Sequence, residues 1–123
     1  MKILTVIGAR PQFVKAAVVS SSLRDFNIDE YLVHSGQHFD DNMSKVFFDE
    51  MKIQEPDAYL GISGGSHGSM TGQMLIKIEE LIIQEEPDWV LVYGDTNSTL
   101  AGALAASKLN IPCAHVEAGL RSD

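Results

Sequence analysis

Short apolar stretches with strand character alternate with longer helical patterns along the chain, and this alternation constrains the fold more than any other feature. The stretches are residues Lys2–Ile7, Glu30–His34, Ala58–Ile62, Trp89–Tyr93 and Cys113–Val116. The third stretch is the weakest. Strands that alternate with helices predict right-handed βαβ crossovers and a parallel sheet with helices on both faces. The predicted fold class is therefore α/β, with a Rossmann-like or flavodoxin-like doubly wound sheet.

Four helices are predicted between these strands. Proline suits the first turn of a helix, so the first helix begins at Pro11 and ends near Asp25. Its expected apolar stripe consists of Phe13, Val14, Ala17, Val18 and Ser21. The second helix spans roughly Asp40–Met51, and the fourth runs from about Ser98 to Leu109.

The third helix has the clearest pattern of the four. Apolar side chains recur at i, i+4, i+7 and i+8, charged side chains face away from them, and Pro87 ends the helix. The apolar positions are Met74, Ile78, Leu81 and Ile82, and the charged positions are Lys77, Glu79 and Glu80. The preceding glycine-rich stretch, Gly61–Gly68, is predicted to be a flexible loop and is a candidate lid.

The natural order for five such strands is 3-2-1-4-5. This order places the topological switch point between the first and fourth strands, where ligands of open α/β sheets usually bind. The loops after strands one, four and five are therefore the expected functional loops. A chain of 123 residues with 45% hydrophobic residues is sufficient for the core of one domain.

The charge balance excludes some partners. Because 17 acidic side chains stand against 9 basic ones, the formal net charge of -8 argues against a nucleic-acid backbone or an anionic membrane surface. An anionic ligand must be held by a local feature such as a helix N-terminus with nearby cations. Cys113 is the only cysteine, so an internal disulfide is impossible. With no signal-peptide pattern and no stretch of ~20 apolar residues, a cytoplasmic location is expected.

The loop after the first strand suits an anion. Gly8 is followed by a helix start that carries Arg10 and Lys15 within its first turns. Free N–H groups, the positive helix end and two cations together favour a phosphate or pyrophosphate. The spacing matches neither the dinucleotide fingerprint nor the Walker loop, which argues against nicotinamide and ATP. The alternative is that Arg10 and Lys15 are solvated charges at a helix start.

Two carboxylates follow neighbouring strands. Asp95 lies after the fourth strand and Glu117 after the fifth, and adjacent parallel strands are roughly 5 Å apart. Such a pair titrates as a coupled unit and suits acid/base chemistry. The alternative for Asp95 is that it caps the helix that follows it.

The loop after the second strand contains Gln37 and His38. Because no cysteine or carboxylate stands at ligand spacing, the expectation is that no metal binds here, and His38 is interpreted as a polar group beside the pocket. His67 is interpreted as a solvated loop residue. Three methionines are expected to fill the core. They are Met51, Met70 and Met74.

Four ordered motifs carry a family resemblance. They are Gly8-Ala9-Arg10-Pro11, Ser35-Gly36-Gln37-His38 with Met43, Gly94-Asp95-Thr96 with Ser98, and His115-Val116-Glu117-Ala118-Gly119-Leu120-Arg121. Together they resemble the non-hydrolysing UDP-N-acetylglucosamine 2-epimerases over the whole chain, most diagnostically in Val92–Ser122. Gln12 replaces the family's usual glutamate, and the second motif continues as Phe39-Asp40-Asp41. These departures are similar to the branch that acts on UDP-2,3-diacetamido-glucuronate.

The resemblance implies a two-domain fold similar to GT-B glycosyltransferases, with residues 1–123 as an incomplete N-terminal Rossmann-like domain. The C-terminal nucleotide-binding domain would be absent, and homo-oligomers are expected. It also implies epimerisation at C2 of a UDP-linked amino sugar, such as UDP-GlcNAc to UDP-ManNAc, for cell-surface polysaccharide precursors. UDP would be eliminated and added back through 2-acetamidoglucal, without nicotinamide or metal.

The resemblance also implies the roles of individual residues. Asp95 and Glu117 become candidates for acid/base and charge-stabilising roles. Arg10, Lys15, His115 and Arg121 become candidates for substrate binding. Gln37 and His38 resemble a loop that holds an activating second UDP-GlcNAc in some members.

Three alternatives are considered. A signalling receiver domain shares the length and strand order, but Arg10, Gly61 and Glu117 stand where its acidic residues and lysine are needed. A GT-B glycosyltransferase is a second alternative, which the Asp95–Glu117 pair disfavours. The third is a non-catalytic fragment that binds a sugar nucleotide.

Overall fold

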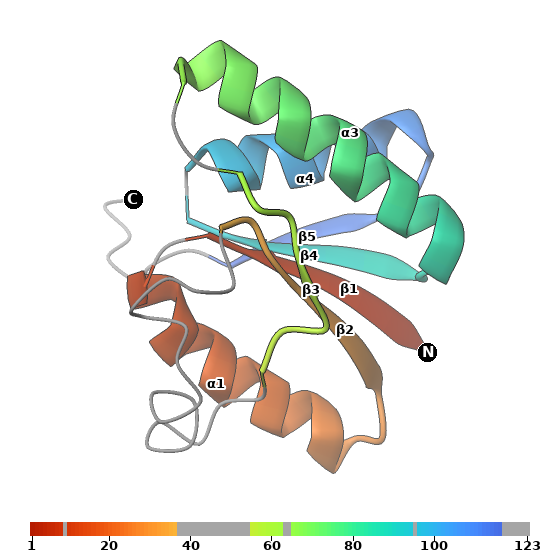
Figure 1. Cartoon of the computed structure of the whole chain (residues 1–123). Helices are drawn as coiled ribbons and strands as arrows, with labels where there is room; N and C mark the ends of the chain where they lie inside the picture. Colours follow the sequence, from red (N-terminus) through yellow and green to blue (C-terminus); the bar gives the residue numbers. More distant parts are fainter. Residues whose placement is uncertain (9, 37–54, 63–64, 95, 117–123) are drawn as a thin grey trace, which may run out of the picture.

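A parallel sheet with helices on both faces makes up the structure, a computed structural model that describes residues 1–8, 10–36, 55–62, 65–94 and 96–116 (Figure 1). For residues 10–14 it gives the helix but not the side chains. The elements are β1 (Lys2–Ile7), α1 (Arg10–Asp25), β2 (Asp29–His34), β3 (Ala58–Tyr59), α3 (His67–Glu85), β4 (Trp89–Tyr93), α4 (Asn97–Lys108) and β5 (Cys113–Val116). The predicted second helix lies outside the described residues.

The sheet has the strand order β3-β2-β1-β4-β5, which confirms the predicted fold class and order. All neighbouring strands pair in parallel, with β1 paired to β2 along its whole length and to β4 on its other side. The strands therefore end at one edge of the sheet, hereafter the carboxyl edge. Helices α1, α3 and α4 all begin at this edge (Figure 1).

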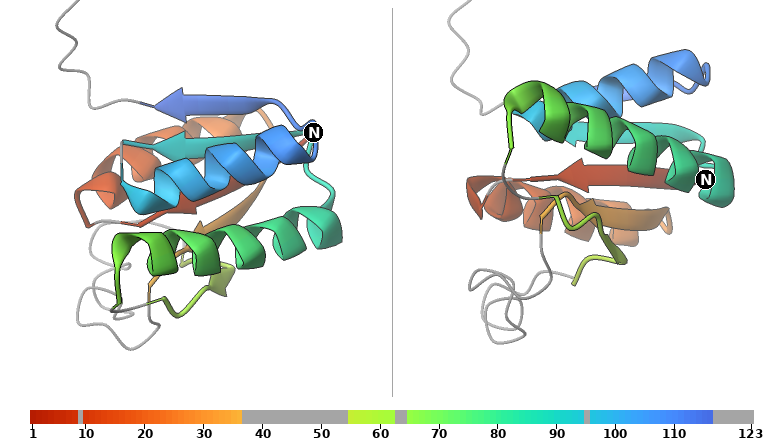
Figure 2. Two further views of the ribbon diagram at one scale, coloured as in Figure 1. Left: turned by 90° about the horizontal axis from the view of Figure 1, so that it is seen from above. Right: turned by 45° about the horizontal axis from the view of Figure 1, so that its top comes forward.

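Two apolar layers enclose the sheet. Helices α3 and α4 lie side by side over one face, and α1 lies on the other (Figures 1 and 2). Strand residues alternate between the layers: Leu4 and Val6 of β1 face α3 and α4, whereas Ile7 belongs to the α1 layer. Met74 is buried in the larger layer and Met70 packs against it, as predicted.

The buried face of α1 differs in part from the prediction: Ala17 packs against the core as predicted, Ser21 is exposed, and the side chains of Phe13 and Val14 lie outside the described residues. Val18 is 67% exposed, while Ala16 and Ser20 are buried against the sheet. Ser20 is buried because its hydroxyl donates to the Glu30 carboxylate of β2 at 2.5 Å, and Thr5 of β1 donates to the other carboxylate oxygen at 2.5 Å. A polar bridge rather than an apolar stripe therefore orients this part of α1.

Element boundaries follow the prediction closely with two exceptions. Strand β3 has two residues instead of five, because Gly61 adopts φ 72° and turns the chain away. The predicted glycine-rich loop is also shorter than Gly61–Gly68, because α3 already begins at His67. Ser66 is its N-cap and accepts a hydrogen bond from the backbone N–H of Ser69 at 3.1 Å.

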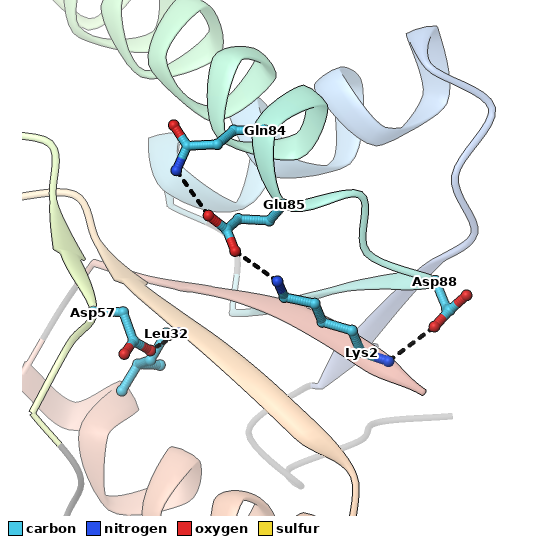
Figure 3. Close-up of polar contacts among 6 residues, drawn as sticks. All are labelled: Lys2, Leu32, Asp57, Gln84, Glu85 and Asp88. Atoms are coloured by element: carbon cyan, nitrogen blue, oxygen red, sulfur yellow. Dashed lines mark hydrogen bonds and ion pairs between the residues drawn. The ribbon is translucent and has the colours of Figure 1, made fainter.

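The opposite edge of the sheet, where the strands begin, carries polar ties (Figure 3). Lys2 of β1 donates from its backbone N–H to Asp88 at 2.8 Å and from Nζ to Glu85 at 2.6 Å. These two contacts connect the start of β1 with the end of α3 and with the residue before β4. Further along the sheet, the backbone N–H of Leu32 in β2 donates to Asp57, directly before β3, at 2.7 Å. In the part of the chain that the structure describes, no helix is long and apolar enough to cross a membrane.

Candidate functional site

The candidate site residues come from segments at the carboxyl edge. Arg10 is the first residue of α1, directly after the β1 loop, and Lys15 lies further along this helix, half-buried. His115 is on β5. The remaining candidates lie outside the described residues: Gln37, His38, Asp95, Glu117 and Arg121.

The strand pairing brings together the chain segments that lead into the two predicted carboxylates. Tyr93 of β4 is in register with Val116 of β5, and the backbone N–H of Gly94 donates to the carbonyl of Val116 at 3.0 Å. Asp95 follows Gly94, and Glu117 follows Val116. The ladder between β4 and β5 therefore extends to the residue before each carboxylate.

The side chain of His115 also contacts the end of β4. Its Nε2 donates to the carbonyl oxygen of Gly94, so the ring carries a proton on Nε2. The ring lies on the α4 side of the sheet and lines a groove of about 540 Å³ between β5 and α4, together with Thr96 and Leu100. The predicted substrate-binding histidine thus contacts the backbone directly before Asp95.

The first turn of α4 is occupied by its own hydrogen bonds. The N-cap is Thr96, whose backbone N–H donates to Oγ1 of Thr99 at 3.2 Å, as in a capping box. Oγ1 of Thr99 donates to the carbonyl of Tyr93 at 2.5 Å. The N-cap position therefore falls on Thr96, which weakens the alternative that Asp95 serves as the N-cap.

His67 is exposed, as predicted, but it lies in a helix rather than in a loop. It is the first residue of α3, and its Nδ1 lies 3.0 Å from Nδ2 of Asn97, the first residue of α4. Because an amide nitrogen only donates, Nδ1 of His67 is the acceptor in this arrangement. The contact ties the starts of α3 and α4 together at the carboxyl edge.

A buried pair of hydroxyls was not predicted from the sequence. Oγ of Ser98, in the first turn of α4, donates to Oγ of Ser35, directly after β2, at 2.9 Å. Both serines are 4% exposed. A Cβ atom placed on Gly8 would stand 2.2 Å from the Ser98 hydroxyl and 2.9 Å from the Ser35 hydroxyl. Gly8 is thus the residue that lets the β1 loop lie directly on this pair.

His34, which ends β2, is a second residue that the sequence analysis missed. Its side chain is 3% exposed, and its Nδ1 accepts a hydrogen bond from the backbone N–H of Gly36 at 3.0 Å. The ring also packs edge-on against Tyr59, with centroids 5.7 Å apart. A histidine at the end of a buried strand, next to a glycine turn, was the available signal.

The electrostatic character of this edge suits an anion. Helices α1 and α4 both start here, and neither has an acidic residue in its first turn. A helix N-terminus carries partial positive charge and unpaired N–H groups. The starts of α1 and α4 therefore bring partial positive charge to both sides of the switch point between β1 and β4.

Comparisons with known proteins agree with this arrangement. The family model described as UDP-N-acetylglucosamine 2-epimerase matches residues 21–123. A UDP-2,3-diacetamido-2,3-dideoxy-D-glucuronate 2-epimerase of Pseudomonas aeruginosa is 63% identical over 123 residues, covering 99% of this chain and 35% of the relative.

Solved structures give the same result. The UDP-GlcNAc 2-epimerase of Methanocaldococcus jannaschii, in complex with UDP-GlcNAc and UDP, is 49% identical with a TM-score of 0.88 and covers 99% of this chain and 34% of its own. That of Neisseria meningitidis, bound to UDP-GlcNAc, is 34% identical with a TM-score of 0.84 and covers 99% of this chain and 33% of its own.

The fold, the paired strand ends and the family match together define this α/β domain: the chain belongs to the UDP-N-acetylglucosamine 2-epimerase family. The resemblance drawn from the sequence motifs is thereby confirmed. The chain spans about a third of the length of the relatives that it matches.

Proposed function

We propose that a complete protein carrying this sequence epimerises C2 of a UDP-linked N-acetylamino sugar. The observation that supports the proposal is the pairing of β4 and β5 up to Gly94 and Val116, the residues directly before Asp95 and Glu117 in the sequence. It is supported by the names of the relatives, which are epimerases of UDP-GlcNAc and of a UDP-diacetamido-glucuronate. These two sugars are the substrates proposed, with cell-surface polysaccharide precursors as the use.

The proposed chemistry avoids direct removal of a weakly acidic C2 proton. UDP leaves C1 as the C2 proton is removed, 2-acetamidoglucal forms, and UDP adds back after the other face of C2 is protonated. Asp95 and Glu117 are proposed to move the proton and to stabilise positive charge at C1. Arg10 and Lys15, with the starts of α1 and α4, stabilise the leaving diphosphate. His115 and Arg121 are proposed to bind the substrate, and Gln37 and His38 to contribute to an activator pocket.

The domain organisation belongs to the same proposal. Residues 1–123 are proposed to form part of the first domain of a GT-B-like pair, with the sugar nucleotide in the cleft between the two domains. The support is the share of the relatives that the chain spans, about a third. The protein is proposed to act as a homo-oligomer.

Deuterium exchange tests the proposal on the complete protein. In deuterium oxide, the parent should place deuterium at C2 of the product, observed by proton NMR of either UDP-sugar. Asp95→Asn and Glu117→Gln should each lower turnover by about 10²–10⁴, the usual range for a positioned acid or base. Glu79→Gln, an exposed carboxylate on α3, is the matched control and should leave turnover unchanged.

Two outcomes would contradict the proposal. If both amide variants exchange the C2 hydrogen at the parental rate, the carboxylates have only structural roles. If the parent instead transfers the sugar to an acceptor, the glycosyltransferase alternative is correct.

A further inference from the structure

The Ser35–Ser98 pair is a buried contact between two distant parts of the chain. Ser35 follows β2, and Ser98 is 63 residues further along, in the first turn of α4. Buried hydroxyls are costly unless they are hydrogen-bonded, and among the described residues each of these two serines has the other as its partner, at 2.9 Å. The pair therefore fixes the distance between the end of β2 and the start of α4.

The backbone around the pair connects further strand ends. The backbone N–H of Ser35 donates to the carbonyl of Ile7 at 3.0 Å, and that of Ile62 donates to the carbonyl of Ser35 at 3.0 Å. On the other side, Thr99 joins the first turn of α4 to the carbonyl of Tyr93 at 2.5 Å. Ser35 thus bonds to the end of β1 and to the segment after β3, while the end of β4 bonds to Thr99, the residue after Ser98.

The β1 loop lies directly against the pair. The absent side chain of Gly8 leaves only enough room for the two hydroxyls, because a Cβ atom there would stand 2.2 Å from one and 2.9 Å from the other. The loop from Gly8 leads into Arg10, and the turn before Ser98 leads back to Asp95. We call residues 8–10 the diphosphate loop and residues 94–97 the carboxylate loop of the proposed site; the serine pair lies between Gly8 of the first loop and the helix turn that follows the second.

We infer that Ser35 and Ser98 are positioning residues for UDP-sugar binding. The inference rests on the proposed function and adds to it two residues that need not touch the substrate. It differs from a purely structural role in one measurable respect: loss of the pair should weaken binding of UDP by folded protein, as well as lowering thermal stability.

The test measures the Kd of UDP by calorimetry on the complete protein. Ser35→Ala and Ser98→Ala should each raise this Kd about fivefold, the size expected for one neutral hydrogen bond. The double variant should also show about fivefold, since both substitutions break the same contact. Ser98→Cys, which keeps a weak donor, should retain part of the affinity. Ser107→Ala, exposed on the same helix, is the control and should match the parent.

Each other outcome has a distinct meaning. A lower melting temperature with an unchanged Kd in the alanine variants shows that the pair is only structural and overturns the inference. A double variant with about 25-fold weaker binding shows that the serines act independently, which also overturns it. A parent protein that does not bind UDP refutes the proposed function itself, a result separate from any serine variant. If Ser98→Ala fails to fold, Ser35→Ala and Ser98→Cys decide the question.

Discussion

Replacement of Gly8 by alanine perturbs the carboxyl edge at its most crowded point. The new Cβ atom would stand 2.2 Å from Oγ of Ser98, whereas ordinary contact begins at 3.4 Å, so the two must separate by about 1.2 Å (3.4 − 2.2). The φ angle of Gly8 is not in the left-handed region, so the glycine is required for space rather than for backbone freedom. The Ser98 hydroxyl can rotate away only by leaving Ser35 buried without its donor.

The expected losses of activity and stability follow from the two ways in which the structure can respond, a shift of the loops or a rotation of the Ser98 hydroxyl. A shift of about 1 Å between the diphosphate loop and the carboxylate loop lowers turnover by about 10²-fold. Loss of the Ser35–Ser98 hydrogen bond instead lowers the free energy of unfolding by about 1–3 kcal/mol. We therefore expect Gly8→Ala in the complete protein to lose about 10²-fold in kcat/KM for the UDP-sugar, together with a lower melting temperature.

The assay compares kcat/KM and melting temperature with two further variants. Gly72→Ala lies in α3 with no atom within 4 Å of the new Cβ, so it should keep full activity and gain about 0.5–1 kcal/mol of stability. In Gly8→Ala/Ser98→Ala the contact at 2.2 Å is removed and the Ser35 hydroxyl at 2.9 Å becomes the shortest contact, so about tenfold of the lost activity should return. Parental turnover in Gly8→Ala, or no recovery in the double variant, would refute the crowding argument.

Three further expectations concern the rest of the domain. Proton NMR should show that the 123-residue chain alone does not interconvert UDP-GlcNAc and UDP-ManNAc, and product formation would contradict this. The same chain should sediment as oligomers, and a clean monomer would contradict that. The hydrogen bond from Lys2 lowers the pKa of Glu85 in the folded protein. The ionised Glu85 therefore stabilises the fold above its unfolded pKa of about 4.3, and this stabilisation is lost as the pH falls through the lower folded pKa. Melting curves should show that Glu85→Gln lowers Tm at pH 7 and not in strong acid, whereas exposed Glu80→Gln changes little. Gly102→Ala places a Cβ 2.8 Å from Cγ1 of Val92. The overpacking should cost about 1–3 kcal/mol, more than the gain in helix propensity of about 1 kcal/mol, so urea unfolding should show a lower free energy of unfolding.

The sheet could be predicted because its signals are local. Strands β1, β4 and β5 match the prediction at both ends, since each is a short apolar stretch bounded by turn or polar residues. The face of α1 could not be predicted in the same way. Ser20 is buried by a carboxylate on β2, and hydrophobic periodicity carries no information about such a long-range polar partner.

In the candidate site, too, the residues that local signals indicate were predicted, and those that depend on long-range contacts were missed. The loops after β1, β4 and β5 follow from the strand order alone, so Arg10, Lys15 and His115 were assigned to the correct edge. The hydroxyl pair beneath them was missed because Ser35 resembles a turn residue and Ser98 a helix-start residue when each is considered separately. His67 was correctly predicted to be exposed but was assigned to a loop, because the N-cap at Ser66 lies within a glycine-rich stretch, without the glutamate that marks a capping box.

The placement of acidic side chains explains how a chain with a formal net charge of -8 can present an anion site. Glu85 and Asp88 lie at the edge where β1 begins, and each accepts a hydrogen bond from Lys2 there (Figure 3). The opposite edge has two helix starts without an acidic residue in their first turns. Charges separated by more than a Debye length of about 8 Å are largely screened at physiological salt, so the local helix ends outweigh the distant carboxylates. Asp95 and Glu117 follow two strands that end at the edge where α1 and α4 begin, and the partial positive charge of these helix starts suits the leaving diphosphate of the proposed reaction.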